Sequence, residues 1–199
     1  MLFVRHGSHD RLGQVLCGRM DGVGLSEAGR RESRALARRL AGRAITAIYC
    51  SPLQRARETA EIIAEASGLN PVRDEAINEI DFGDWTGARF KDLDGQPAWD
   101  RWNVARGQHR PPNGESMLEL QLRVSRRMES LINEHRDQTI VAVCHGDVIR
   151  AALAHALGLS LDRHDRFDIA PAALSVIVGG DWGLKVHSIN EVADDSDVD

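Results

Sequence analysis

Two short apolar runs that end in the same way constrain the fold of this chain most strongly. Residues 2–4 lead into an arginine, a histidine and a glycine, and residues 139–143 lead into a cysteine, a histidine and a glycine. Apolar runs of this kind, each stopped by a glycine, are typical of buried strands in a parallel sheet. Because parallel strands end at the same edge of a sheet, we expect the two histidines, His6 and His145, to face one ligand.

The rest of the chain alternates between strand and helix patterns. We expect further strands over residues 44–50, 71–77, 172–178 and 183–189, and helices after Ser26, from Ser51-Pro52, over 115–134 and over 148–157. The last two strands are close enough to pair antiparallel at one edge. The expected fold class is α/β, a three-layer α/β/α sandwich. Its sheet is mostly parallel and doubly wound, with an antiparallel edge strand and a small helical cap insertion over roughly residues 80–113.

Charge and composition narrow the class of protein. We interpret residues 1–190 as a single domain and residues 191–199 as a disordered acidic tail, whose five acids account for the whole net charge of −5. The body is therefore near neutral, which speaks against a nucleic-acid partner. No apolar run approaches a membrane span, and the first strand begins directly after Met1, which leaves no room for a signal peptide. Three scattered cysteines suit a reducing compartment, so we expect a cytoplasmic protein.

Basic side chains gather at the predicted edge of the sheet. Arg5 ends the first strand, and Arg55 opens the helix after the second strand, so both are delivered beside His6 and His145. Such a cluster of like charge is tolerable only if an anion normally sits in it. Arginine forks match the oxygens of a phosphoryl group, and the helix after Gly146 offers backbone N–H donors. The sequence therefore predicts a phosphate-binding pocket.

A histidine can also act as a nucleophile toward phosphorus. That chemistry needs a neutral imidazole, cations around the phosphoryl oxygens, and an acid that gives a proton to the leaving oxygen. Glu79 follows the third predicted strand at the same edge. A bound phosphate dianion would raise the pKa of its carboxyl group, as a proton donor requires.

With these residues the chain resembles the histidine phosphatase superfamily, the phosphoglycerate-mutase-like enzymes, and in character their small bacterial phosphatases. The resemblance covers roughly residues 2–178, in the family's own order. It rests on Arg5-His6-Gly7, Leu25-Ser26 with Gly29, Ser51-Pro52-Leu53-Gln54-Arg55-Ala56 with Thr59-Ala60, Glu79 within E-I-D-F-G-D-W-T-G, Gly114-Glu115-Ser116, and Val143-Cys144-His145-Gly146. It implies a phosphomonoesterase for a small phosphorylated metabolite that needs no metal and no other cofactor.

The resemblance also implies a role for each matching residue. His6 would be the phosphorylated nucleophile, while Arg5, Arg55 and His145 would hold the phosphoryl group. Glu79 would be the general acid and then the base that activates water. Because His6 must be neutral while Glu79 is protonated, we expect a bell-shaped dependence of rate on pH, with an optimum from mildly acidic to neutral.

The chain departs from the family pattern soon after Gly7. Relatives often carry an asparagine several residues after the R-H-G motif and a Gln-Gly pair beyond it, where this chain has residues 8–12 and Cys17-Gly18. Arg11 is a candidate to substitute as a phosphate ligand. His9 is more simply interpreted as a solvated loop residue.

Four other functions stay open. Cys144 and Arg150 fit the C-x5-R signature of cysteine phosphatases. A mutase would use the same phosphohistidine, although the modest cap favours hydrolysis. A binding module that has lost catalysis is a third alternative. A metal site on His6, His9 and His145 is the fourth, and the neighbouring arginines would repel its cation.

The sequence does not select the substrate. The cap residues that would contact it are Phe82, Trp85, Trp99, Trp102 and His109. Sugar phosphates, nucleotides, a cobalamin-pathway phosphate and phosphoprotein all stay open. The oligomeric state is open as well, with a homodimer among the options.

Overall fold

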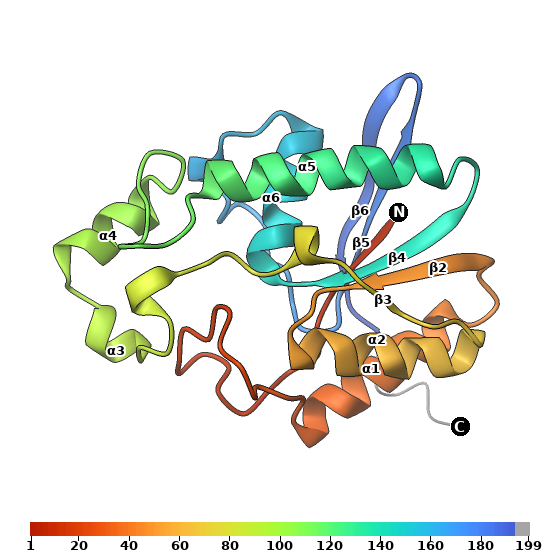
Figure 1. Cartoon of the computed structure of the whole chain (residues 1–199), viewed down its shortest axis with the longest axis horizontal. Coiled ribbons are helices and arrows are strands. Elements are labelled where there is room, and N and C mark those ends of the chain that lie inside the picture. Colours follow the sequence, from red (N-terminus) through yellow and green to blue (C-terminus); the bar gives the residue numbers. More distant parts are fainter. Residues whose placement is uncertain (194–199) are drawn as a thin grey trace.

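Six strands form one mixed sheet at the centre of the computed structural model, which describes residues 1–193 (Figure 1). The strands are β1 (Leu2–Arg5), β2 (Ile45–Cys50), β3 (Val72–Arg73), β4 (Thr139–Cys144), β5 (Leu174–Gly180) and β6 (Gly183–Glu191). Their order is β3-β2-β4-β1-β5-β6; β3, β2, β4 and β1 are parallel, and β5 and β6 run antiparallel to their neighbours. The predicted mostly parallel sheet with an antiparallel edge is confirmed.

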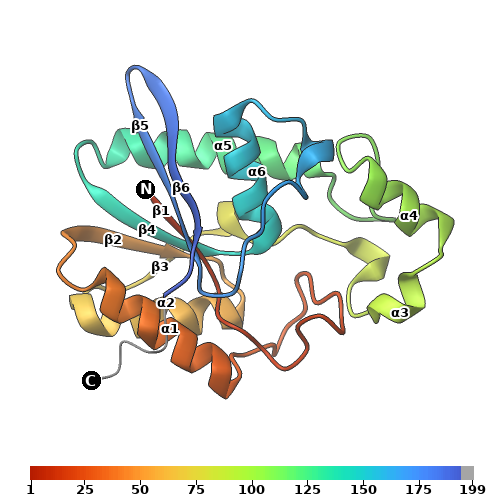
Figure 2. The ribbon, with the colours of Figure 1, turned by 180° about the vertical axis from the view of Figure 1, so that it is seen from behind.

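Helices lie on both sides of this sheet. They are α1 (Glu27–Leu40), α2 (Gln54–Ser67), α3 (Phe90–Leu93), α4 (Pro97–Val104), α5 (Met117–Glu134) and α6 (Gly146–Leu157). α1 and α2 cover one face and α5 and α6 the other, which gives the predicted three layers (Figures 1 and 2). The short helices α3 and α4 stand apart from these layers as a small cap (Figure 2).

Burial on both faces explains why β1 is apolar at successive positions. Leu2 and Val4 pack with α1 and α2, whereas Phe3 packs with α5 and α6 on the opposite face. All three side chains are buried. Since side chains alternate along a strand, a strand covered on both faces needs apolar residues at every position.

α1 begins as predicted and α2 does not. The side chain of Ser26 accepts a hydrogen bond from the backbone N–H of Gly29 and so caps α1. α2 begins only after Leu53, so the predicted start at Ser51 is wrong. The Ser51 hydroxyl accepts the Leu53 backbone N–H at 3.3 Å and contacts His145 at 2.7 Å, which uses it within the site rather than as a cap.

The third strand is shorter than predicted. β3 holds two residues instead of residues 71–77, and the chain then enters a single 3-10 turn, η1 (Glu75–Ile77). Asp74 ends the strand because its carboxylate caps this turn and pairs with Arg127 at 2.5 Å. The other 3-10 turns are η2 (Gly83–Trp85) and η3 (Leu161–Arg163).

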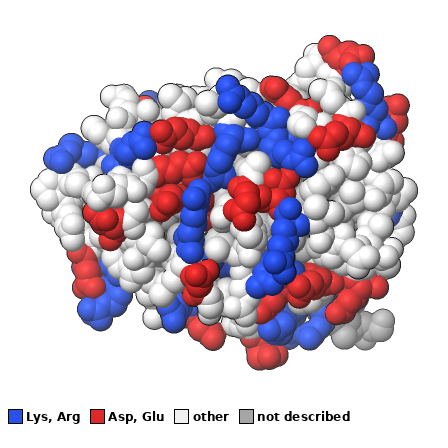
Figure 3. Space-filling model, in the orientation of Figure 1, with Lys and Arg blue, Asp and Glu red and all other residues white. Residues whose placement is uncertain are grey.

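The last strand is longer than predicted. β6 extends to Glu191, one residue into the predicted tail, where that carboxylate pairs with Arg39. The rest of the predicted tail from residue 194 onward lies outside the described residues. Within residues 1–193, no helix combines the length and the apolar character needed to cross a bilayer. On the face shown in Figure 3, positive and negative side chains intermix.

Candidate active site

The carboxyl ends of β1 and β4 meet, as their shared pattern predicts. The two strands are parallel neighbours with Arg5 opposite Cys144, and the His6 backbone N–H donates to the Cys144 carbonyl oxygen at 3.0 Å. The rings of His6 and His145 consequently lie with their centroids 5.2 Å apart. Both rings are buried.

A cavity of about 370 Å³ opens at this edge of the sheet. Its wall contains five of the predicted site residues, namely Arg5, His6, Arg55, Glu79 and Gly146. His145 lies behind this wall, fully buried, with its Nδ1 3.3 Å from Nη2 of Arg55. Another cavity, of about 480 Å³, lies at the opposite end of the sheet and holds none of these groups.

Local hydrogen bonds orient the His6 ring. Its Nδ1 lies 2.8 Å from the Gly7 carbonyl oxygen, which only accepts, so Nδ1 carries the proton and Nε2 keeps a lone pair. The Nε of Arg55 donates to that Nε2 at 3.2 Å. Burial, followed by the charges of Arg55 and Arg5, holds the pKa of His6 well below its ordinary value of 6.5. His6 is therefore neutral, as a nucleophile must be.

Close packing explains the glycine of the R-H-G motif. The Gly7 backbone N–H donates to the Thr59 hydroxyl at 3.0 Å, and a Cβ at Gly7 would lie 2.5 Å from the Gly29 carbonyl oxygen. A Cβ at Gly29 would in turn lie 2.0 Å from the Ser8 carbonyl oxygen. Gly7 and Gly29 thus allow the loop after β1 to pack closely against α1, and this close packing is the reason for both glycines.

Two buried guanidinium groups approach the His6 ring. Arg55 is 2% exposed and donates from Nη2 to the Gly18 carbonyl oxygen at 2.7 Å. Arg5 donates from Nη1 to the Ile169 carbonyl oxygen at 2.5 Å. Nη1 of Arg55 and Nε of Arg5 are buried without a partner among the described residues. Because a buried unpaired donor is costly, these N–H groups fit an anionic ligand.

His145 is held from both sides of its ring. Nη2 of Arg55 donates to Nδ1 at 3.3 Å, so the ring proton sits on Nε2 and points to the Ser51 hydroxyl oxygen 2.7 Å away. A carboxylate oxygen of Glu79 lies 3.9 Å from the same Nδ1. Burial and the charge of Arg55 hold the pKa of His145 well below 6.5, so this ring is neutral as well.

Glu79 is placed by hydrogen bonds to its own backbone rather than by a long strand. Its carbonyl oxygen accepts from Nε of Arg19 at 2.8 Å and from Nη2 of Arg123 at 3.1 Å. Its Oε1 accepts the Ile80 backbone N–H at 3.0 Å. Burial, followed by the charge of Asp147, raises the pKa of Glu79 from 4.5 to about 7. The carboxyl group therefore keeps its proton through the mildly acidic range.

Three predicted contacts are not brought to the cavity. Arg11 is exposed and donates from Nη1 to the Met20 sulfur at 3.2 Å, so the loop carries it away from the wall. Trp85 packs edge-on against two other tryptophan rings, and His109 lies in the loop that leads from α4 to α5. Of the predicted substrate contacts, the wall holds Phe82, Trp99 and Trp102.

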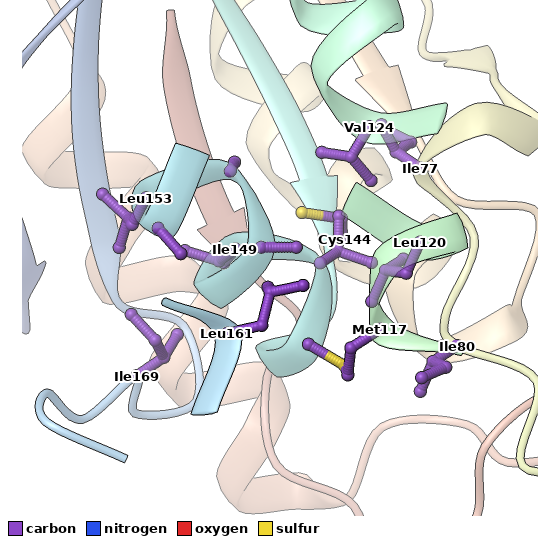
Figure 4. Close-up of a cluster of buried hydrophobic side chains, with 14 of the residues drawn as sticks. Ile77, Ile80, Met117, Leu120, Val124, Cys144, Ile149, Leu153, Leu161 and Ile169 are labelled. Carbon is purple, nitrogen blue, oxygen red and sulfur yellow. The ribbon is translucent and has the colours of Figure 1, made fainter. Parts of the chain in front are cut away.

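Cys144 does not act as a nucleophile in this structure. It is fully buried in the core between β4, α5 and α6, beside Met117 and Ile149 (Figure 4). Burial raises the pKa of its thiol, so no thiolate forms near neutral pH. The cysteine-phosphatase alternative is therefore excluded. The C-x5-R spacing of Cys144 and Arg150 does not mark a cysteine-phosphatase site in this chain.

The cavity wall also contains polar residues that sequence reasoning did not assign to it. His9 is 7% exposed, so its interpretation as solvated is wrong, and its ring centroid lies 5.5 Å from that of His6. The position of His9, three residues after His6, is the sequence signal that could have placed it in the site. Asp147 and Arg106 also lie in the wall. Asp147 could have been expected there because it directly follows Gly146, whereas Arg106, after α4, belongs to no motif that would have indicated it. Among the described residues, no three His, Cys, Asp or Glu side chains are arranged to hold a metal ion.

Comparisons with known proteins find a phosphatase and a phosphoglycerate mutase among the relatives of this chain. Phosphoserine phosphatase 1 of Hydrogenobacter thermophilus is 34% identical over 155 residues, which cover 77% of this chain and 74% of that protein. A 2,3-bisphosphoglycerate-dependent phosphoglycerate mutase of Brucella melitensis is 32% identical over 170 residues, 80% of this chain and 82% of that one. The chain spans 53% of the length of several mycobacterial relatives that it also matches.

A solved structure and a family match complete the comparison. The mycobacterial glucosyl-3-phosphoglycerate phosphatase superposes with a TM-score of 0.86 at 26% identity, over 96% of this chain and 98% of that one. The histidine phosphatase superfamily (branch 1) matches residues 1–192, nearly the whole chain. The predicted fold is thereby confirmed, and this chain belongs to the histidine phosphatase superfamily.

Proposed function

We propose that this protein releases inorganic phosphate from a small phosphorylated metabolite through a phosphohistidine on His6. The family and the named relatives support the enzyme class, a phosphatase of the histidine phosphatase type. One observation carries the mechanism: neutral His6 keeps the lone pair of Nε2 beside the unpartnered N–H groups of Arg55 and Arg5.

In the first step, Nε2 of His6 attacks phosphorus, and the N–P bond forms as the bond to the alcohol oxygen breaks. Arg5 and Arg55 hold the other phosphoryl oxygens and stabilise their charge. If the Ser51 hydroxyl donates to Nε2 of His145, Nδ1 of that ring carries a proton toward the phosphoryl group. The His145 ring can make this switch because a hydroxyl both donates and accepts.

Glu79 moves the protons of both steps. Its raised pKa keeps the carboxyl group protonated, so that it can give this proton to the leaving alkoxide. In the second step the resulting carboxylate takes a proton from water, whose oxygen attacks phosphorus. The N–P bond then breaks, phosphate leaves, and neutral His6 and protonated Glu79 are restored.

A screen of phosphomonoesters for phosphate release tests this proposal. We expect the wild-type protein to hydrolyse p-nitrophenyl phosphate and at least one small phosphorylated metabolite, and His6→Ala to lose this activity. His155→Ala, which replaces an exposed histidine of α6, is the matched control and should keep it. Wild-type rates in His6→Ala would contradict the proposal.

A phosphoglycerate mutase is the second candidate, favoured by the Brucella relative. A mutase must shield its phosphohistidine from water until the phosphoryl group returns to a product isomer. The cap here consists of one helix of 4 residues and one of 8, which favours hydrolysis. Incubation with 3-phosphoglycerate and 2,3-bisphosphoglycerate separates the two, since isomer formation faster than phosphate release would identify a mutase.

We further propose that the enzyme acts without a metal ion and in the cytoplasm. Arg5 and Arg55 would repel a cation from the two histidines. The three cysteines are unpaired, which suits a reducing compartment. Treatment with a chelator should leave the rate unchanged, whereas a loss that a divalent cation restores would argue against this view.

A further inference from the structure

Glu79 lies on a stretch of chain that no strand or helix holds in place. Residues 78–82 connect the turn η1 to the turn η2 and form no regular element. Ile77 and Ile80, on either side of Glu79, anchor this stretch in the core beneath α5 (Figure 4). Because hydrophobic contacts have no direction, hydrogen bonds must set the way in which the backbone of Glu79 faces.

Two guanidinium groups converge on the carbonyl oxygen of Glu79. Nε of Arg19, in the loop after β1, donates to it at 2.8 Å, and Nη2 of Arg123, in α5, donates to it at 3.1 Å. Nη1 of Arg123 also donates to the Ala76 carbonyl oxygen at 2.9 Å. Two positive charges that meet at one oxygen repel each other, so this arrangement needs a negative charge beside it.

Glu115 supplies that negative charge. Its Oε1 accepts from Nε of Arg123 at 2.6 Å, and its Oε2 accepts from Nη2 of Arg123 at 2.9 Å, which makes a two-point ion pair. The same Oε2 accepts from Nη2 of Arg19 at 3.1 Å. The Glu115 side chain is 14% exposed, so water screens the three charges only partly. The mechanism above gives no role to Glu115, although its Gly114-Glu115-Ser116 motif belongs to the family pattern.

Backbone contacts tie Glu115 to the same stretch of chain. Its N–H donates to the Asp81 carbonyl oxygen at 2.7 Å, and the Asp81 N–H donates to Oε2 of Glu115 at 3.3 Å. A Cβ on Gly114 would lie 2.5 Å from the Asp81 carbonyl oxygen, and a Cβ on Gly83 would lie 2.1 Å from that of Pro112. The chain after Glu79 therefore packs directly against the chain that leads into α5.

We propose that Glu115 is a positioning residue for the proton transfers of Glu79. Its carboxylate holds Arg19 and Arg123 on the Glu79 carbonyl oxygen, and this fixed backbone aims the Glu79 carboxyl group at the leaving oxygen and at the attacking water. Glu115 lies outside the cavity wall, so it acts only through Glu79. This role rests on the phosphatase function proposed above.

Two rate constants of Glu115→Gln test the role, because glutamine keeps the size of the side chain but loses its charge. With protein in excess over labelled p-nitrophenyl phosphate, nitrophenol formation measures transfer to His6, which needs no acid. Loss of the label from His6 measures hydrolysis, which needs Glu79 as the base. We expect hydrolysis to slow about 10-fold and transfer to change by less than about 2-fold. Glu129→Gln, an exposed residue of α5, is the matched control and should change neither.

A double variant separates positioning from a general structural role. In Glu79→Gln the group that Glu115 positions is absent, so adding Glu115→Gln should slow the loss of label by less than about 2-fold. Equal slowing of transfer and hydrolysis by Glu115→Gln alone would refute the proposal. The same 10-fold loss in the Glu79→Gln background would refute it as well.

Arg19→Gln keeps the proposal testable if circular dichroism shows that Glu115→Gln does not fold. The Arg19 side chain is 35% exposed and supplies one of the two donors to the Glu79 carbonyl oxygen. Its loss should slow hydrolysis of the phosphohistidine about 3- to 10-fold, the contribution of one hydrogen bond, and leave transfer unchanged. An unchanged rate of hydrolysis would refute the proposal.

Failure of the phosphatase proposal gives a different result, since the wild-type protein would then form neither nitrophenol nor labelled His6. Hydrogen exchange at the Ile80 backbone N–H, which donates to Oε1 of Glu79, then reports the position of the carboxyl group. Glu115→Gln should speed this exchange at least about 10-fold relative to the amides of β4. An equal change at all these amides, or none at Ile80, would refute the positioning role.

Discussion

Replacing Glu79 by glutamine should lower activity and raise stability at the same time. The variant keeps the size of the side chain and an oxygen for the Ile80 backbone N–H, but it can neither give nor take the proton of the reaction. General acid–base catalysis contributes about 100- to 10,000-fold, so kcat for an alkyl phosphate should fall by that range. With p-nitrophenyl phosphate, whose phenolate leaves without a proton, phosphoryl transfer to His6 should slow less, although steady-state turnover still needs Glu79 as the base of the second step.

The stability change follows from the pKa of the buried carboxyl group. Folding raises the pKa of Glu79, which is 9% exposed, from 4.5 to about 7. Below about pH 4.5 the group is neutral in both the folded and the unfolded protein, and its contribution to stability is complete. Between pH 4.5 and about 7 only the unfolded protein releases this proton, so stability falls by roughly 3 kcal/mol, and above about pH 7 the folded protein carries the buried charge at that cost. Glutamine has no such cost.

Urea unfolding at two pH values measures this difference. Relative to the wild type, Glu79→Gln should gain roughly 3 kcal/mol of unfolding free energy between pH 4.5 and pH 8. Glu65→Gln, an exposed residue of α2, is the control and should show no such gain. An equal stability difference at both pH values, together with an unchanged kcat, would refute the assigned role of Glu79.

Three further changes test single contacts of the site. Ser51→Ala removes the hydroxyl beside Nε2 of His145 and should lower kcat about 10-fold, by roughly the free energy of one buried hydrogen bond, with little change in KM; an unchanged kcat would dismiss the proposed switch of the ring proton. Cys144→Ala should retain most activity but lose about 1–2 kcal/mol of stability in urea, because it leaves a small void in the core; loss of activity in the folded variant would reopen the cysteine mechanism. Arg11→Ala should change kcat/KM by less than about 2-fold, because its guanidinium contacts Met20 outside the cavity; a large rise in KM would return it to the phosphate ligands.

The sequence predicted the fold and the meeting of His6 with His145 because both depend on short-range signals. An apolar run followed by a glycine marks the end of a buried strand, and parallel pairing of β1 with β4 then brings His6 to His145. The R-H-G motif and the S-P-L-Q-R-A motif carry this information within a few residues each. Such patterns report which residues share an edge of the sheet.

What the sequence did not predict depends on loops and on long-range contacts. His9 is buried because the loop after β1 folds back onto the site, and Arg11 leaves it because the same loop then turns outward. Arg106 reaches the cavity only because the cap packs its guanidinium on Trp102 and pairs it with Asp147, 41 residues further along the chain. No local pattern encodes such a contact.

Trapping the phosphoryl-enzyme tests the central claim most directly. Glu79→Gln mixed with p-nitrophenyl phosphate should release a burst of nitrophenol and then stall, because attack by His6 needs no acid with this substrate but hydrolysis needs the missing base. We expect one acid-labile phosphoryl group per protein, on the peptide that contains His6, and none on Glu79→Gln/His6→Ala. A burst without label on His6, or label on any other residue, would contradict it.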